Sequence, residues 1–166
     1  MDDTKNISGV IVPLLTFFEE DGSIYYEANE ALALHSLKNS ADVLFVFGST
    51  GEGLYFKNKP QKKKDYLLWL RILARKYKLS TPIVVGVYGE DPKTVIKDAE
   101  QVLNMHPKSG LVVPPPVGKK LSENEQIEFY TKIASKIDAP IYIYNNPGRF
   151  GGTEITVGAL EELKKR

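Results

Sequence analysis

The chain has 166 residues, of which 42% are hydrophobic and 26% charged, a balance typical of a globular domain with its own core. Its 22 basic and 21 acidic residues leave a formal charge of +1, and no run of Lys or Arg is long enough to suggest binding to a nucleic-acid backbone. The absence of cysteine excludes disulfides, thiolate metal sites and cysteine nucleophiles.

The N-terminal segment is unlike a targeting signal. Asp2 and Asp3 precede a short apolar run, which has the wrong charge and length for a secretory signal. No apolar stretch of the sequence is long enough to span a bilayer. We therefore expect a cytoplasmic protein that associates with no membrane and no nucleic acid.

Apolar runs of strand length alternate with longer segments of helical period along the whole chain. The expected strands cover residues 10–15, 43–47, 82–87, 110–113 and 140–144. The expected helices cover residues 27–38, 60–77, a segment that begins at Pro92, 122–137 and 155–166. This alternation predicts a parallel sheet covered by helices, built as one domain over residues 1–166.

Two helix starts carry capping signals. Asp91 before Pro92 is typical of an N-cap followed by a first-turn proline. Ser122 with Glu125 three residues later is a capping box.

A run of three lysines lies early in the helix expected at 60–77. Lys62, Lys63 and Lys64 are interpreted as a solvated face of that helix. A site for an anionic partner is the alternative.

The loop after the second strand is the first candidate site. In parallel α/β proteins, ligands gather where the loops leave the C-terminal ends of the strands. Gly48, Ser49, Thr50, Gly51 and Glu52 occupy this position after the strand at 43–47. The glycines allow close approach of the backbone, and the two hydroxyls with adjacent amides can bind a carboxylate. An ordinary polar turn is the alternative.

The loop after the fifth strand is the second candidate site. The hydroxyl of Tyr144 at the strand end can serve as acid, base or hydrogen-bond donor. Arg149, five residues later, can hold a carboxylate or phosphate with its guanidinium. Taken alone, Tyr144 fits structural packing as well, and Arg149 fits an ordinary surface arginine.

Together, the two loops resemble the family of dihydrodipicolinate synthase and N-acetylneuraminate lyase, the class I pyruvate-dependent aldolases. The segment 48–52 matches the family pattern G-[ST]-T-G-E, and Tyr144, Asn145, Asn146 and Pro147 match its Y-N-x-P segment. The spacing of the two motifs also agrees, and the likeness extends over nearly the whole chain. The resemblance implies a (β/α)₈ TIM barrel, of which this chain supplies the first five β/α units.

The resemblance also implies a role for each motif residue. Ser49 and Thr50, with the close backbone approach at Gly48, would hold the carboxylate of pyruvate or another 2-keto acid. Tyr144 would be the phenol that transfers protons beside a Schiff base, and Arg149 would hold a carboxylate of the aldehyde substrate. The expected reaction is carbon–carbon bond making or breaking through an iminium, which needs a lysine amine but neither a metal nor a further cofactor.

The family's Schiff-base lysine lies on the sixth strand, shortly after the helix represented here by residues 155–166. The sequence ends before that position, and a complete barrel needs about 250 residues. We therefore expect a truncated gene product or fragment that is inactive alone, or a barrel completed by a second polypeptide. Lys119 and Lys120 are the lysines expected nearest the barrel mouth. Relatives are commonly oligomeric, so a homo-oligomer is also expected.

The subfamily and two other readings stay open. Arg149 resembles the synthases and Ser49 the neuraminate lyases, whereas Pro115 and Pro116 replace a tyrosine that synthases use; 2-keto-3-deoxy sugar-acid aldolases fit equally. A non-catalytic keto-acid-binding or assembly protein would keep the carboxylate loop without the nucleophile. A genuine open five-stranded doubly wound fold, binding some other anion, is the remaining possibility.

Overall fold

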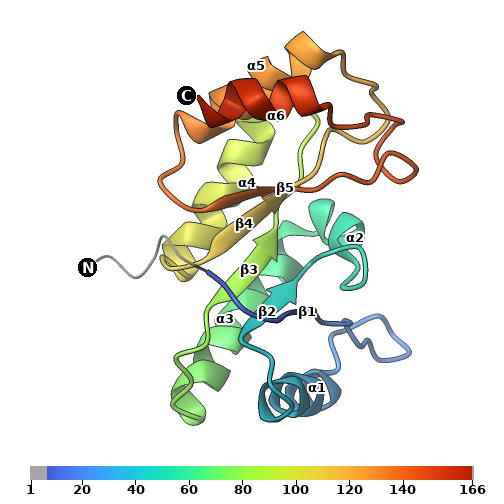
Figure 1. Ribbon diagram of the computed structural model, residues 1–166. Helices are drawn as coiled ribbons and strands as arrows, with labels where there is room; N and C mark the ends of the chain where they lie inside the picture. The colour runs from blue at the N-terminus through green and yellow to red at the C-terminus, as the bar shows by residue number, and fades with distance from the viewer. Residues whose placement is uncertain (1–6, 166) are drawn as a thin grey trace.

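One parallel sheet organises the computed structural model, which describes residues 7–165 (Figure 1). Asp2 and Asp3 lie outside the described residues. The strands are β1 (Ile11–Pro13), β2 (Val43–Val46), β3 (Ile83–Gly86), β4 (Gly110–Val113) and β5 (Ile141–Ile143). The helices are α1 (Tyr26–Lys38), α2 (Gly53–Lys57), α3 (Pro60–Lys76), α4 (Pro92–Met105), α5 (Glu123–Ala134) and α6 (Val157–Lys164).

The strands lie in the sheet in the order in which they occur in the chain. Each pairs in parallel with the next, for example Phe45 with Val84 and Val85 with Leu111. A doubly wound sheet reverses its strand order at a switch point, and this sheet has no reversal. The doubly wound alternative is therefore wrong, and the expectation of the first five β/α units of a barrel is confirmed.

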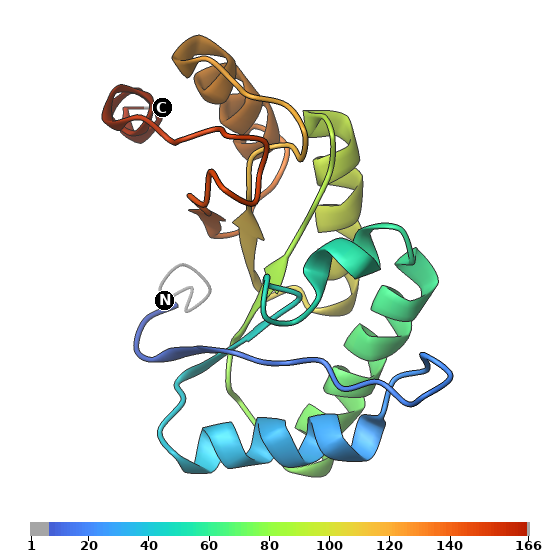
Figure 2. The same ribbon diagram turned by 90° about the vertical axis from the view of Figure 1, so that its right-hand side faces the viewer.

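The two faces of the sheet have different coverings. Successive helices pack against one another along the outer face, and Figure 2 shows the opposite face open on the left. Side chains alternate between the faces, as in any strand. Leu44, Val46, Val85, Leu111 and Val113 point outward into the main core beneath the helices.

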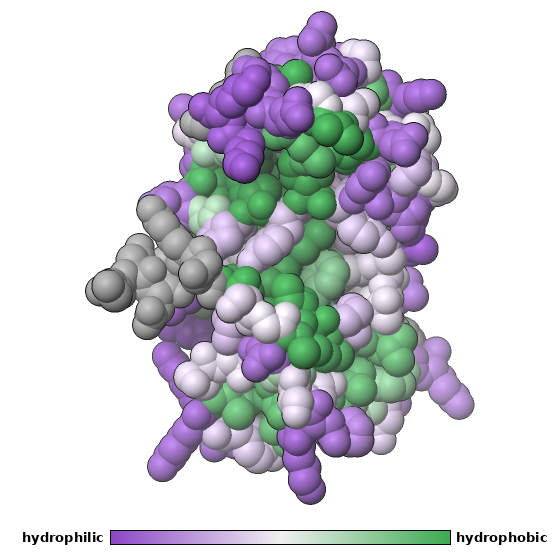
Figure 3. All heavy atoms as spheres, viewed as in Figure 1, coloured by the Kyte–Doolittle hydropathy of each residue, from purple (hydrophilic) through white to green (hydrophobic). Residues whose placement is uncertain are grey.

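A second apolar cluster lines the inner face. Val43, Val84 and Val112 form its buried centre, and half-buried side chains surround them: Ile7, Phe45, Tyr142 and Tyr144. Figure 3 shows apolar side chains gathered across the middle of this face. Ile11 and Leu15 keep 37% and 48% of their surfaces exposed. Within residues 7–165, β1 and β5 are the edges of the sheet.

Local sequence signals account for most helix boundaries. The Asp91 side chain accepts a hydrogen bond from the Thr94 amide, and the capping box of Ser122 and Glu125 is present, so both predictions are confirmed. The helix expected to reach residue 137 ends at Ala134. The five-residue helix α2 was not predicted, because such a short element has little helical period.

The interpretation of the lysine run as a solvated face is wrong at its centre. Lys63 is only 4% exposed, and its ammonium pairs with Asp98 on α4 at 2.7 Å. Lys62 is half-buried, and Lys64 is exposed. The three side chains point in different directions because consecutive helical residues are about 100° apart.

Candidate active site

The loop after β2 begins with a residue in an unusual backbone conformation. Phe47 has a φ of 56°, in the left-handed region that costs a non-glycine residue of the order of 1–3 kcal/mol. The Gly53 amide then donates to the Gly48 carbonyl at 2.9 Å, which closes the loop over residues 48–53. The fold therefore holds this segment in a defined, strained path.

Contacts from the end of β1 fix the other side of the same loop. The Thr16 hydroxyl donates to the Gly51 carbonyl at 2.9 Å. A Cβ atom at Gly51 would lie 2.8 Å from the Leu14 carbonyl oxygen, closer than a side chain allows. The backbone amides of Ser49 and Thr50 donate to no acceptor within residues 7–165. The loop thus presents two unpaired amides beside two hydroxyls.

The Tyr144 hydroxyl meets this loop from the end of β5. The Ser49 hydroxyl donates to the phenol oxygen at 3.4 Å, and the Asn146 side-chain amide donates to it at 3.1 Å. The Tyr144 ring also meets the ring of Phe150 edge-on, with centroids 5.6 Å apart. The two motifs that are distant in the sequence therefore form one site.

The charge and hydrogen bonds around Tyr144 stabilise its phenolate. The bonds from Ser49 and Asn146, together with the positive charge of Arg149, lower the pKa of Tyr144 below its ordinary value. Desolvation acts in the opposite direction and is smaller than the first two effects. A tyrosine in this setting exchanges a proton more readily than a tyrosine in water.

Arg149 lies in a tight turn after β5. Its amide and that of Phe150 both donate to the Asn146 carbonyl at 3.1 Å. Its side chain is exposed, while Phe150 is fully buried and anchors the turn. Arg149 is thus at the same end of the sheet as Ser49 and Tyr144. Thr50 is exposed, and its hydroxyl bonds to no group within residues 7–165.

A family model described as "Dihydrodipicolinate synthetase family" matches residues 6–166. The chain belongs to this family. A relative from Parabacteroides distasonis, 4-hydroxy-tetrahydrodipicolinate synthase, is 32% identical over 146 residues, which are 88% of this chain and 47% of the relative. The synthase of Chlamydia caviae is 32% identical over 162 residues, 94% of this chain and 50% of the relative.

Solved structures of family members agree with the fold. The 2-keto 3-deoxygluconate aldolase from Picrophilus torridus has a TM-score of 0.81 at 27% identity, over 95% of this chain and 54% of the other. YagE from E. coli K12, solved in complex with pyruvate, has a TM-score of 0.81 at 24% identity, over 95% of this chain and 50% of the other. The chain spans about half the length of the relatives it matches.

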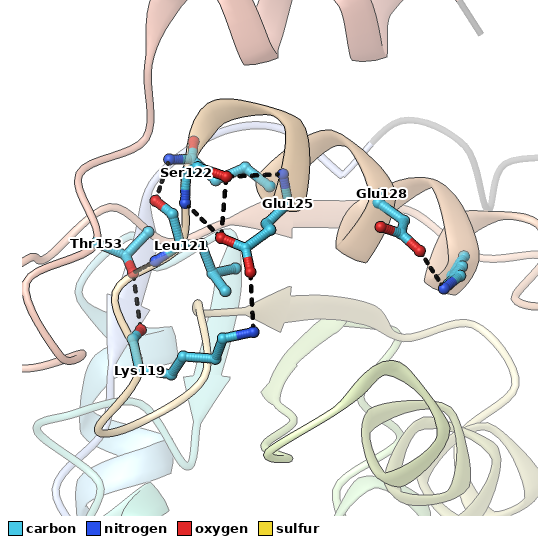
Figure 4. Close-up of polar contacts among 8 residues, drawn as sticks. Lys119, Leu121, Ser122, Glu125, Glu128 and Thr153 are labelled. Carbon is cyan, nitrogen blue, oxygen red and sulfur yellow. Dashed lines mark hydrogen bonds and ion pairs between the residues drawn. The ribbon is translucent and has the colours of Figure 1, made fainter.

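Within this family member, polar contacts tie the loop after β4 to the loop after β5 (Figure 4). The Thr153 hydroxyl accepts from the Leu121 amide at 2.9 Å and donates to the Lys119 carbonyl at 3.0 Å. The Lys119 ammonium lies 3.1 Å from Glu125, whose pKa is held at about 2 by the Ser122 amide and by Lys119. The Lys119 ammonium is therefore paired with Glu125 at the start of α5. Lys120 beside it is exposed.

Sequence reasoning missed two residues of the site. Asn146 belongs to the Y-N-x-P segment, but its bond to Tyr144 depends on the folded turn. Tyr88, just after β3, is buried and donates from its hydroxyl to the Phe47 carbonyl at 2.6 Å. Its position at the C-terminal end of a strand was the available signal.

Two kinds of feature are absent from the described part of the chain. No three His, Asp or Glu side chains in residues 7–165 converge to form a metal site. No helix in that range has the length and apolar character needed to cross a bilayer.

Proposed function

We propose that this chain forms the keto-acid-binding and proton-transferring part of an aldolase-type carbon–carbon lyase that acts on pyruvate or another 2-keto acid through a Schiff base. The single observation that carries the proposal is the 3.4 Å contact between the Ser49 and Tyr144 hydroxyls. It joins a group suited to binding a carboxylate to a group suited to moving a proton.

The carboxylate would bind at the loop after β2. The backbone amides of Ser49 and Thr50 have no acceptor within residues 7–165, and the hydroxyls of the two residues lie beside them. Such donors suit an anion. Binding there would bring the adjacent keto carbon toward the Tyr144 hydroxyl. YagE, which shares this fold, was solved in complex with pyruvate.

Tyr144 would transfer the proton that completes Schiff-base formation. An amine that adds to the keto carbon gives a carbinolamine, whose hydroxyl leaves as water once it is protonated. The phenol would supply that proton, and the resulting phenolate would accept hydrogen bonds from Ser49 and Asn146. The lowered pKa of Tyr144 supports this role.

The reacting amine would come from polypeptide beyond residues 1–166, which would also complete the barrel. The apolar inner face and the edge strands β1 and β5 support this part of the proposal, because exposed edges and apolar faces favour further pairing. A homo-oligomer or a second chain could cover the same surface. A cytoplasmic location remains a prediction from the sequence.

Arg149 would bind a second anionic group, such as the carboxylate of an aldehyde substrate. Its exposed guanidinium lies close enough to influence the pKa of Tyr144. This position favours an aldehyde substrate that carries an acidic group of its own. Synthase, lyase and sugar-acid aldolase activities would differ in that second substrate.

Borohydride trapping with pyruvate tests the proposal on the protein translated from the native reading frame. We expect the mass of one reduced pyruvate adduct on a lysine, and loss of that adduct when Ser49 and Thr50 are replaced together by Ala and Val. Saturable pyruvate binding without an adduct would instead establish the non-catalytic keto-acid-binding alternative. Absence of both binding and adduct would refute both functions.

A further inference from the structure

Lys63 carries a charge in the outer core that the proposed chemistry does not use. Its ammonium lies 2.7 and 2.8 Å from the two Asp98 carboxylate oxygens and donates to the Gly86 carbonyl at 2.9 Å. The ammonium also lies 5.5 Å from the centre of the Phe47 ring. A buried ion pair is weak support for stability, because desolvation offsets much of the attraction. Stability alone therefore does not account for the Lys63–Asp98 pair.

The ion pair clamps the backbone at the end of β3. Asp98 accepts a hydrogen bond from the Tyr88 amide at 3.0 Å, in addition to its contact with Lys63. Lys63 holds the Gly86 carbonyl and Asp98 holds the Tyr88 amide, two residues apart. Side chains from α3 and α4 thus determine the direction in which Tyr88 leaves the strand.

Tyr88 in turn fixes the strained start of the loop after β2, which covers residues 48–53 and is called the carboxylate loop below. Its hydroxyl donates to the Phe47 carbonyl at 2.6 Å. Cβ atoms at Gly53 and Gly86 would lie 2.0 and 2.1 Å from that carbonyl oxygen, so both positions must be glycine for it to fit. The hydrogen bond and the two glycines hold Phe47 in its left-handed conformation, directly before Gly48 and Ser49.

The ring of Tyr88 reaches the other half of the site. It stacks on Phe150 with centroids 6.4 Å apart and planes 23° apart. Phe150 meets Tyr144 edge-on. Tyr88 is therefore in direct contact with the residue before the carboxylate loop and with the residue that supports the phenol.

We propose that the buried Lys63–Asp98 pair, acting through Tyr88, is a positioning device that sets the contact between the Ser49 and Tyr144 hydroxyls. The pair touches neither hydroxyl, and its effect passes through the Phe47 carbonyl on one side and Phe150 on the other. The importance of this pair for catalysis rests on the proposed function. The structural effect of the pair can be measured without substrate.

The test compares two buried tyrosines whose hydroxyls bond to different parts of the molecule. Tyr88→Phe removes the bond to the Phe47 carbonyl, and Tyr66→Phe removes the 3.4 Å bond from the Tyr66 hydroxyl to the Asn29 side chain on α1. Both hydroxyls are buried, so a general loss of stability affects both variants. The readouts are the pKa of Tyr144, from NMR of ring-labelled tyrosine, and pyruvate affinity from calorimetry.

We expect Tyr88→Phe to raise the pKa of Tyr144, in the direction also expected for Ser49→Ala. It should weaken pyruvate binding by roughly three- to tenfold, as expected for one lost hydrogen bond. Tyr66→Phe should change neither quantity, because its hydroxyl bonds to Asn29 on α1. Lys63→Met should move both in the same direction as Tyr88→Phe. If Lys63→Met lowered the melting temperature but left the Tyr144 titration unchanged, the ion pair would have no part in positioning.

Equal results for Tyr88→Phe and Tyr66→Phe would overturn the inference. Failure of the proposed function has a different signature, because the unsubstituted protein would then bind no pyruvate. In that case a shifted Tyr144 titration in Tyr88→Phe would still support the positioning device.

Discussion

The Ser49 hydroxyl lies 3.4 Å from the Tyr144 hydroxyl, although the two residues are 95 positions apart in the sequence. Because β2 and β5 run in the same direction, their C-terminal ends lie on the same side of the sheet. Strands β3 and β4 lie between them, so the side chains and the loop after β2 must span that distance across the inner face. The hydroxyl contact joins the two loops that carry the family motifs, and it can be probed by removing either hydroxyl.

Ser49→Ala is expected to raise the pKa of Tyr144 toward its ordinary value of 10.0, because it removes the largest effect that lowers it. At a fixed pH below 10, the variant should therefore contain less phenolate. NMR titration of ring-labelled tyrosine measures the shift. Ser135→Ala is the control, since within residues 7–165 the Ser135 hydroxyl bonds to the Lys132 carbonyl on α5 and to no group of the site. An equal shift in both variants would contradict the prediction.

If the proposed function holds, Tyr144→Phe is expected to slow proton transfer about 100-fold or more in the protein translated from the native reading frame, with little change in pyruvate affinity. Exchange of pyruvate methyl protons with deuterated water, followed by NMR, measures enamine formation without knowledge of the second substrate. Tyr142→Phe is the matched control, because that hydroxyl bonds to the Ile7 carbonyl. Unchanged exchange in Tyr144→Phe would remove Tyr144 from the mechanism.

Lys63→Ala is expected to lower the free energy of unfolding by about 3 kcal/mol, because it leaves Asp98 without its ammonium partner. The Asp98 side chain keeps 18% of its surface exposed, which places the effect at the low end for a broken buried pair. Urea unfolding of Lys63→Ala and of exposed Lys64→Ala makes the comparison. Lys64→Ala should stay within about 0.5 kcal/mol of the parent, and similar losses in both would contradict the burial of Lys63.

Gly86→Ala is expected to lower the free energy of unfolding by about 1–3 kcal/mol. The new Cβ atom would lie 2.1 Å from the Phe47 carbonyl oxygen, so that oxygen would have to move. Gly148→Ala is the control, since the nearest atom to its Cβ would be 3.9 Å away. Thermal unfolding of both variants tests the difference. A fully tolerated alanine at position 86 would show that the Phe47 carbonyl is free to move.

Short-range patterns allowed much of the fold to be predicted. Apolar runs gave the five strands, and Asp91 and Ser122 gave two helix starts, because each signal depends on neighbours within a few residues. The motif at 48–52 and the segment at 144–147 gave the two loops that meet. A parallel sheet places both loops at the C-terminal ends of their strands, but the contact between the Ser49 and Tyr144 hydroxyls was not predicted.

Features set by partners distant in the sequence were not predictable from local patterns. Lys63 is buried because Asp98, 35 residues later, lies opposite it across the α3–α4 contact. Phe47 adopts a positive φ because Tyr88 and two glycines hold its carbonyl. Nothing in the residues next to Lys63 indicates that it is buried. Nothing in the residues next to Phe47 indicates its positive φ.

Phe150 has no exposed surface, although it lies in a turn between glycine-containing segments. A loop anchored in this way loses its conformational freedom when the protein folds and not when a ligand arrives. The backbone of the turn that carries Arg149 is therefore ordered before any ligand arrives, and only the exposed Arg149 side chain would lose further conformational entropy on binding. If this turn binds an anion as proposed, the ligand must reach a guanidinium whose backbone position is already set.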